Sequence, residues 1–326
     1  MTCVLITGGA GFIGSHLVRA LLAAGRQVVV LDDLSAGKRG NLTGEERFLK
    51  GDVLDAATLD GALEGVDAVV HLAAVPSVHD YVQDWKATSR TNLAGTISVL
   101  DAATRRGLPV INASSCAVYG VSTEMPLKES QAVKPISGYG ADKLCGEYHA
   151  GAMAAMLGTQ AVSLRFFNVY GPRQTRNSPY SGVITQFLDC WTHGRAATVF
   201  GDGEQTRDFI YVGDIAAALM RAIDYAMSGG TGVFNVCTGK QTSLNALVAA
   251  VETATGASLQ KAYAPAREGD IVLSYGDPGQ ASAVLGFDAQ TPLTAGLAET
   301  VKWLATQPVV QETVTATPQA AGVPPD

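Results

Sequence analysis

The chain has 326 residues, of which 47% are hydrophobic and 16% are charged, so it contains enough apolar material for a sizeable core and for two coupled domains. Its formal net charge of −7 and its dispersed lysines and arginines argue against a nucleic-acid-binding surface. Five cysteines without C-x-x-C spacing indicate neither a disulfide framework nor a metal site, and the lack of a leader and of an 18-residue apolar span predicts a cytoplasmic protein with no membrane association.

Short apolar runs alternate with amphipathic ones along the first half of the chain. The predicted strands are CVLIT, QVVVLDD, RFLKGD, DAVVHLAA, PVINASS and AVSLRFFNVYG, and GFIGSHLVRALLAAG is the helix between the first two. Continuous apolar strands are typical of a parallel sheet that is covered by helices on both faces. We therefore predict an α/β fold with a doubly wound parallel sheet. Further helices are expected near residues 84–106, 142–157, 214–227, 243–254 and 292–305.

The alternation of strands and helices breaks at the turn-rich segment GPRQTRNSPYSGV. We predict that a smaller α/β C-terminal domain comprises residues 169–206 and 231–305. Residues 1–168 form the larger domain, with about 207–230 packing back onto it. Residues 306–326 are rich in Pro, Ala, Thr and Val and show no period, which predicts a disordered tail.

The segment TGGAGFIG, residues 7–14, follows the first predicted strand and opens the first predicted helix. Its Gly9-x-Gly11-x-x-Gly14 spacing, which also reads as Gly8-x-x-Gly11-x-x-Gly14, is typical of the dinucleotide-binding loop of a Rossmann-type fold. Glycines let the backbone approach a pyrophosphate, and the N–H groups at the start of the helix favour its negative charge. A tight turn that needs glycine only for packing is the alternative, and the strand-loop-helix context argues against it.

Two aspartates that end predicted strands are expected at the adenosine half of the dinucleotide. Asp32 lies 18 positions after Gly14, where a carboxylate hydrogen-bonds ribose hydroxyls and repels a 2′-phosphate. We therefore predict NAD rather than NADP, although Lys38 and Arg39 nearby would favour a phosphate. Asp52 is expected at the edge of the adenine, with an N-cap of the next helix as its alternative role.

The segment SGYGADK, residues 137–143, places a phenol and an amine four positions apart. On a helix, Tyr139 and Lys143 would share one face. A fixed cation near a tyrosine favours the phenolate, so this pair could transfer a proton near neutral pH. Taken alone, the pair could also arise on a helix by chance.

Taken together, TGGAGFIG, HLAA, SSCAVYG, YGADK and RFFNVYGP resemble the extended short-chain dehydrogenase/reductase superfamily, and specifically the UDP-hexose 4-epimerases, over roughly residues 3–305. The resemblance implies that the larger domain binds NAD and that the smaller one binds a nucleotide sugar. The implied reaction is epimerisation at C4 of UDP-glucose or UDP-galactose through a transient 4-keto sugar.

The resemblance also implies roles for single residues. Tyr139 would be the base, Lys143 would hold the nicotinamide ribose and lower the pKa of Tyr139, and Ser115 would hydrogen-bond the reacting oxygen of the sugar. Asn92 would support the backbone of the active site. The full set expected to bind the cofactor is Gly8, Gly11, Phe12, Ile13, Gly14, Asp32, Asp33, Asp52, Val53, Leu72, Ala73, Ala74, Asn92, Tyr139 and Lys143.

The two residues after Ser115 distinguish between two reactions. The related 4,6-dehydratases carry Asp-Glu at these positions, because elimination needs an acid and a base. This chain has Cys116 and Ala117, which disfavours elimination. A sugar-nucleotide dehydratase remains the alternative function if another carboxylate substitutes. A non-catalytic NAD-binding module is disfavoured because Tyr139, Lys143 and Ser115 are all present.

The resemblance places the diphosphate of a UDP-sugar near three polar side chains. Asn168, Arg207 and Arg267 are expected at the phosphates, where guanidinium groups bind bidentately. Asp270 is expected to accept a hydrogen bond from the uridine ribose. A surface ion pair is the alternative for each charged residue, most seriously for Arg267 and Asp270, which are close in sequence.

Apolar and small residues complete the expected substrate site. Val199 and Phe200 would flank the uracil, and Val183 would lie in the same cleft. Ser274 aligns with a tyrosine that narrows the pocket around the C2 substituent in some members. The smaller serine predicts that UDP-GlcNAc and UDP-GalNAc are accepted as well as, or instead of, the plain hexoses.

The helix at 142–157 carries a surface of small residues and methionines that a monomer would leave in water. In the family, this helix and the helix at 92–106 pair across a two-fold axis. We therefore predict a homodimer through these two helices.

Overall fold

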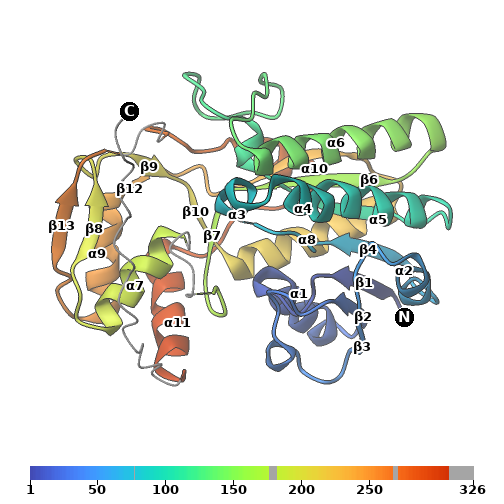
Figure 1. Cartoon of the computed structure of the whole chain (residues 1–326), viewed down its shortest axis with the longest axis horizontal. Helices are drawn as coiled ribbons and strands as arrows, with labels where there is room; N and C mark the ends of the chain where they lie inside the picture. The colour runs from blue at the N-terminus through green and yellow to red at the C-terminus, as the bar shows by residue number, and fades with distance from the viewer. Residues whose placement is uncertain (77, 176–181, 267–270, 308–326) are drawn as a thin grey trace, which may run out of the picture.

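The computed structural model describes residues 1–76, 78–175, 182–266 and 271–307, and Figure 1 shows their arrangement. A seven-stranded sheet with the order β11-β6-β5-β4-β1-β2-β3 forms the larger part, and every pairing in it is parallel. This order confirms the predicted α/β fold with a doubly wound parallel sheet. The strands are β1 (Cys3–Thr7), β2 (Gln27–Asp32), β3 (Arg47–Lys50), β4 (Ala68–His71), β5 (Val110–Ser115), β6 (Ala161–Phe166) and β11 (Gly232–Val236).

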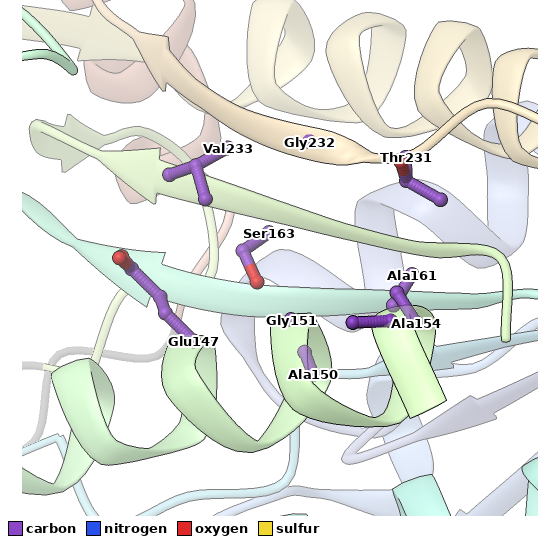
Figure 2. A pocket seen from close by; sticks show the side chains of 10 residues that line it. Glu147, Ala150, Gly151, Ala154, Ala161, Ser163, Thr231, Gly232 and Val233 are labelled. Atoms are coloured by element: carbon purple, nitrogen blue, oxygen red, sulfur yellow. The ribbon is translucent and has the colours of Figure 1, made fainter. Parts of the chain in front are cut away.

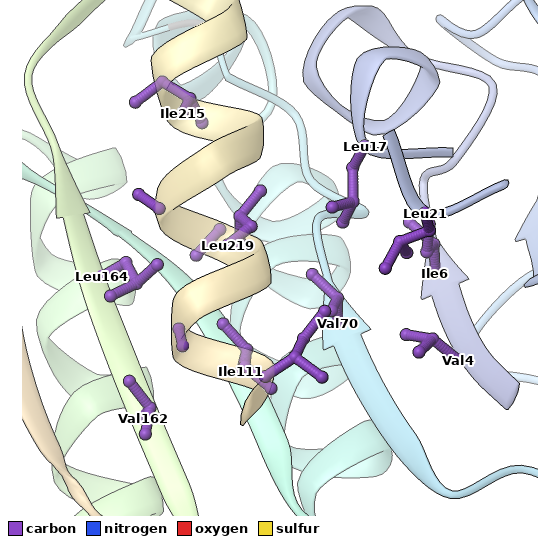
Figure 3. Packing of buried hydrophobic residues seen from close by; sticks show 14 of the residues in the cluster. Val4, Ile6, Leu17, Leu21, Val70, Ile111, Val162, Leu164, Ile215 and Leu219 are labelled. Atoms are coloured by element: carbon purple, nitrogen blue, oxygen red, sulfur yellow. The ribbon is translucent and has the colours of Figure 1, made fainter. Parts of the chain in front are cut away.

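Helices cover both faces of this sheet, which explains why its strands are apolar at consecutive positions. Val4 and Ile6 of β1 face one layer, and Leu5 between them faces the other. Figure 3 shows the first layer, in which side chains of α1 and α8 pack against the strands. The first layer contains α1 (Phe12–Ala23), α8 (Val212–Met227) and α10 (Gly279–Leu285), and the second contains α2 (Ala56–Ala62), α5 (Gly95–Thr104) and α6 (Gly138–Leu157).

The helix predicted near residues 84–106 is confirmed as a continuous helical segment from Trp85 to Thr104, with a π-helical turn in its middle. Short helices α3 (Val78–Gln83) and α4 (Trp85–Ser89) lead into a π-helical turn (Arg90–Ala94), which continues into α5. Single 3₁₀ turns lie at Arg39–Asn41 and Cys116–Val118.

The smaller part lies on the left in Figure 1 and has its own hydrophobic cluster, which includes Phe187, Leu247 and Leu297. Three short strand pairs stabilise it, and one of them, β7 with β10, lies between the two parts (Figure 1). The pairs are β7 (Asn168–Tyr170) with β10 (Phe209–Tyr211), β9 (Thr206–Arg207) with β12 (Thr242–Ser243), and β8 (Ala197–Phe200) with β13 (Lys261–Ala264). Its helices are α7 (Val183–Thr192), α9 (Leu244–Thr255) and α11 (Leu293–Ala305). Within the described residues, none of the helices is both long enough and apolar enough to span a bilayer.

Candidate active site

The glycine-rich turn between β1 and α1 is closely packed against the end of β4. Gly8 has a φ of +70°, and a Cβ added there would lie 2.7 Å from the backbone nitrogen of Ala73. A Cβ on Gly14 would overlap the carbonyl oxygen of Gly8. The turn is closed by a hydrogen bond from the Gly11 N–H to the Gly8 carbonyl, at 3.1 Å. This close backbone, at the N-terminus of a helix, fits the pyrophosphate of a dinucleotide.

Asp32 joins the end of β2 to this turn. Its buried carboxylate accepts hydrogen bonds from the Ala10 and Leu34 N–H groups, each at 2.9 Å. Burial raises the pKa of Asp32, and the two backbone hydrogen bonds oppose that shift. Asp33 is exposed and accepts hydrogen bonds from both the backbone and the hydroxyl of Ser35.

The N-cap role considered for Asp52 belongs to a different residue. Asp55 caps α2, because its carboxylate accepts a hydrogen bond from the Thr58 N–H at 2.7 Å. Asp52 is exposed and accepts from the Leu54 N–H at 2.9 Å. Val53, the next residue, is buried.

Asn92 fastens the segment after β4 to the π-helical turn. Its side chain accepts a hydrogen bond from the Val75 N–H at 2.7 Å and donates to the Val75 carbonyl at 2.9 Å and to the Tyr81 hydroxyl at 2.8 Å. Tyr81 in turn donates to the carboxylate of Asp142 on α6, at 2.6 Å. These contacts tie the predicted cofactor-contacting segment to the helix that carries Tyr139. Within that segment, Leu72, Ala73 and Ala74 are half-buried.

Ser115, Tyr139 and Lys143 converge where β5 ends against the start of α6. The hydroxyl of Ser115 accepts from the Ala117 N–H at 3.1 Å and is close enough to Tyr139 to lower the pKa of its phenol. The Lys143 ammonium donates to the Ala113 carbonyl at 2.7 Å and lies 5.8 Å from the centroid of the Tyr139 ring.

Burial dominates the ionisation of this group. Burial, and to a lesser extent the neighbouring Cys116, raises the pKa of Tyr139 to about 12 against the lowering effect of Ser115. Burial also lowers the pKa of Lys143 to about 8, against the opposing effect of Asp142. Lys143 therefore keeps most of its charge at pH 7. The decrease in the Tyr139 pKa that was expected from Lys143 is therefore not found, since the pKa is raised by burial and only Ser115 lowers it.

Two buried polar residues near Ser115, Tyr139 and Lys143 were not predicted from the sequence. The imidazole of His71 hydrogen-bonds the hydroxyls of Thr7 at 2.7 Å and of Thr96 at 3.1 Å. Burial, together with the smaller effect of the Lys143 charge, lowers the pKa of His71 to about 3. The HLAA motif drew attention to this region, but only the three-dimensional structure gives the partners of His71.

Asp208 is the second missed residue, and it is completely buried. Its carboxylate accepts hydrogen bonds from the backbone and hydroxyl of Thr238, at 2.9 and 2.6 Å, and from the N–H groups of Gly239 and Gly276, at 2.9 and 3.4 Å. Asp208 directly follows Arg207 in the chain. Its hydrogen bond with the Gly276 N–H therefore connects this part of the chain to the segment that contains Ser274. The available signal was an acidic residue directly before the apolar run Phe209–Tyr211, which was not predicted as a strand.

Several predicted substrate residues lie on connected segments of the smaller part. Arg207 donates to the Ile271 carbonyl at 2.6 Å, three positions before the buried Ser274. Asn168 begins β7, which pairs with β10, and β10 begins two residues after Arg207. Phe200 ends β8, and its carbonyl accepts from Gln205 at 2.8 Å. The other predicted residues are Val199, which is buried in β8, Val183, which begins α7, and Arg267 and Asp270, which lie outside the described residues.

Comparison with known proteins identifies the family. A family model described as "NAD dependent epimerase/dehydratase family" matches residues 4–237. A UDP-glucose 4-epimerase of Mycolicibacterium smegmatis is 39% identical over 308 residues, covering 92% of this chain and 97% of that protein.

Two solved structures are similar over nearly the whole chain. A UDP-N-acetylglucosamine 4-epimerase from Methanobrevibacter ruminantium in complex with UDP-N-acetylmuramic acid has a TM-score of 0.89 and 36% identity, covering 93% of this chain and 98% of that chain. A Thermus thermophilus UDP-glucose 4-epimerase in complex with NAD has a TM-score of 0.86 and 34% identity, covering 94% and 99%.

These matches confirm the predicted resemblance, and they confirm the prediction of an enzyme with NAD as its cofactor. They agree with the glycine turn, whose backbone is packed so closely that a Cβ on Gly8 or Gly14 would overlap neighbouring backbone atoms. The chain therefore belongs to the NAD-dependent epimerase/dehydratase family.

Proposed function

We propose that the protein interconverts UDP-hexoses that differ in configuration at C4, with UDP-glucose and UDP-galactose as one substrate pair. The observation that carries the proposal is the convergence of Ser115, Tyr139 and Lys143 at the end of β5, together with Cys116 and Ala117 in place of an acid and a base. The similarity to enzymes named UDP-glucose 4-epimerase supports it.

In the proposed mechanism, Tyr139 acts on the proton of the sugar's O4 hydroxyl. The Tyr139 oxygen accepts this proton as C4 is oxidised and returns it when C4 is reduced from the opposite face. Ser115 would hydrogen-bond the reacting oxygen while it interacts with Tyr139, and the ammonium of Lys143, 5.8 Å from the centroid of the Tyr139 ring, would favour the phenolate. When bound, NAD supplies the acceptor and then the donor of the C4 hydride, so the cofactor ends unchanged.

Cys116 is poorly suited to the elimination that a dehydratase performs. Burial, together with the smaller effect of the nearby Asp208, raises the pKa of its thiol to about 11, so the thiol is protonated at neutral pH. Ala117 has no ionisable group. Proton removal from C5, which elimination requires, would need a base from elsewhere in the chain.

The diphosphate and uridine are proposed to bind along the smaller part. Asn168 and Arg207 would contact the phosphates, with Arg267, while the uracil would lie between Val199 and Phe200. Val183 and Asp270 complete the proposed contacts.

Ser274 bears on the sugar itself. Its small, buried side chain occupies little volume in the segment that Asp208 and Arg207 anchor. We propose that the site accepts an acetamido group at C2, so that UDP-GlcNAc and UDP-GalNAc are also interconverted. The similarity to an enzyme named UDP-N-acetylglucosamine 4-epimerase supports this extension.

The direct test is to incubate the purified protein with UDP-glucose, UDP-galactose, UDP-GlcNAc and UDP-GalNAc. Proton NMR should show each C4 pair approaching one equilibrium mixture from both sides, and mass spectrometry should show unchanged mass. Tyr139→Phe should reduce turnover by about 100-fold or more, whereas Tyr148→Phe, on the exposed side of the same helix, should not. Loss of water would identify a dehydratase instead. No conversion of the acetamido sugars would refute only the extension to C2.

A further inference from the structure

Glu147 lies on the same face of α6 as the two proposed active-site residues of that helix. Tyr139, Lys143 and Glu147 are spaced four residues apart, so they follow one another along the helix. Glu147 forms a bidentate ion pair with Arg165 of β6: Nε to Oε1 is 2.9 Å and Nη2 to Oε2 is 2.7 Å. Both side chains are buried, with 3% and 6% of their surfaces exposed.

This ion pair is attached to the residue directly before Ser115. The Ser114 hydroxyl donates a hydrogen bond to Glu147 Oε1, and Ser114 is the register partner of Arg165 in the sheet. One turn earlier on the helix, Lys143 donates to the carbonyl of Ala113. The helix therefore contacts the last residues of β5 at two successive positions, immediately before the strand ends at Ser115.

The other side of the pair reaches the chain just after Ser115. The Arg165 guanidinium lies 4.8 Å from the centroid of the Tyr119 ring. The Tyr119 hydroxyl donates to the side chain of Asn235 on β11 at 2.7 Å, and the Asn235 N–H donates to Glu129 at 2.7 Å. Both chain segments that flank Ser115 are thus fastened to one buried pair of charges.

A groove of about 400 Å³ extends along α6 as far as Glu147 (Figure 2). Small side chains form its walls, with Ala150, Gly151 and Ala154 on the helix and Ser163 on β6. The space beside Gly151 is open, since a Cβ added there would have no neighbour within 4 Å. The groove therefore offers a position for a control substitution on the same helix.

The Glu147–Arg165 pair could serve either the stability of the fold or the positioning of its neighbours, and the energetics of buried charges distinguish the two roles. Desolvating two charges costs much of the free energy that their attraction returns, so apolar residues of similar volume usually stabilise a fold as well or better. Stability alone does not require charges at these positions. The contacts with Ser114 and Tyr119 do require charged groups. A carboxylate and a guanidinium hold their partners in a defined direction and at a defined distance, which methyl groups cannot do.

We propose that Glu147 and Arg165 are positioning residues, whose ion pair fixes the end of β5 against α6 and thereby sets the separation of the Ser115 and Tyr139 hydroxyls. The inference rests on the proposed function of that site. It assigns no contact with substrate to either residue.

The test uses the double variant Glu147→Met/Arg165→Met, which removes both charges at once and so leaves no uncompensated charge in the core. We expect kcat for UDP-sugar conversion to fall about 10-fold to 100-fold, the cost of a misplacement on the order of 1 Å. KM and the dissociation constant for NAD should stay within about twofold, since the proposed binding residues lie elsewhere. The acid limb of the kcat profile should move to higher pH, because the hydrogen bond from Ser115 that lowers the pKa of Tyr139 is weakened.

Two further variants complete the design. Glu147→Gln keeps one oxygen that can accept from Ser114 and from Arg165 Nε, but it loses the acceptor for Arg165 Nη2 and the negative charge, so it should recover only part of the lost kcat. Gly151→Ala should match the wild-type protein in kcat and in pH profile. A folded double variant with wild-type kcat and an unmoved acid limb would overturn the proposal.

A readout that does not depend on turnover separates this inference from the proposed function. With ¹³Cζ-labelled tyrosine, the Tyr139 resonance is identified by its disappearance in Tyr139→Phe. It should shift in the double variant and stay in place in Gly151→Ala. If the wild-type protein converts no UDP-sugar but the resonance shifts, the proposed function fails and the positioning role stands. If the resonance stays in place in the folded double variant, the positioning role is refuted whatever the activity.

Discussion

Asp32 is the residue whose charge bears most directly on the choice between NAD and NADP. Asp32→Asn preserves its size and its ability to accept from the Ala10 N–H, but removes the charge that would repel a 2′-phosphate. We expect the ratio of NAD to NADP affinity to fall about 10-fold, equivalent to about 1.4 kcal/mol. Isothermal titration calorimetry with NAD and with NADP measures this ratio of affinities. Asp224→Asn, an exposed partner of Arg26, is the matched control, and an unchanged ratio in Asp32→Asn would contradict the assignment.

His71 gives the fold a defined dependence on pH. Its pKa in the folded protein is about 3, below the ordinary value of 6.5, so the unfolded chain binds more protons between these limits. Above pH 6.5 His71 is neutral in both the folded and the unfolded chain. As the pH drops from 6.5 toward 3, His71 lowers the free energy of unfolding by up to about 1.4 kcal/mol per pH unit. Urea unfolding at pH 7 and 5.5 should show a smaller pH effect in His71→Asn than in wild type or in the exposed-site variant His149→Asn. Equal pH effects in all three would contradict this role.

At the scale of elements, the turn into α1 tests whether its glycines are required by close packing. An alanine at Gly14 would overlap the Gly8 carbonyl and lie 2.7 Å from the Cα of Gly9. Backbone atoms cannot easily move away, so Gly14→Ala should lower the free energy of unfolding by about 1–3 kcal/mol and NAD affinity by about 10-fold or more. Gly61→Ala in α2 has open space around the new Cβ and should stabilise by about 0.5–1 kcal/mol. Wild-type stability and NAD binding in Gly14→Ala would show that this packing argument is wrong.

The main elements could be predicted because their signals are local. Continuous apolar runs marked the central strands, and periodicity marked α9 and α11 to within one residue at each end. Within the helix expected near 84–106, the π-helical turn could not be predicted, since Asn92 in this turn bonds the backbone of Val75, a contact that no local pattern reveals. The strand pairs β9–β12 and β7–β10 are only two or three residues long and depend on distant partners.

The same distinction applies to the candidate site. Ser115, Tyr139 and Lys143 were selected from short motifs, and the fold brings them together. The partners of His71 and Asp208, by contrast, come from strands and loops far away in the sequence. Sequence letters alone also could not show that burial would raise the pKa of Tyr139, because desolvation depends on what surrounds the ring.

For the whole molecule, the prediction is a homodimer through α5 and α6. Three large apolar side chains of α6 are exposed in the monomer, namely Tyr148 at 62%, Met156 at 80% and Leu157 at 64%. Analytical ultracentrifugation should give about twice the chain mass of 33.8 kDa at micromolar concentration. Met156→Glu should shift the protein toward monomer, because burying an unpaired carboxylate is costly.

The control for this experiment is Met227→Glu, at an exposed position at the end of α8 on the opposite face of the sheet. It should leave the mass unchanged. A wild-type protein that sediments as a monomer at micromolar concentration would refute the homodimer without affecting the assignment of the active site.

The central claim is that one hydrogen leaves C4 of a UDP-sugar and returns to the same carbon, with Tyr139 managing the hydroxyl proton. The most direct measurement uses UDP-glucose that carries deuterium at C4, in ordinary water, with NMR and mass analysis of the product. The account predicts UDP-galactose that retains the deuterium at C4, formed by the wild-type protein and not by Tyr139→Phe. Product with solvent hydrogen at C4, or equal conversion by Tyr139→Phe, would contradict it.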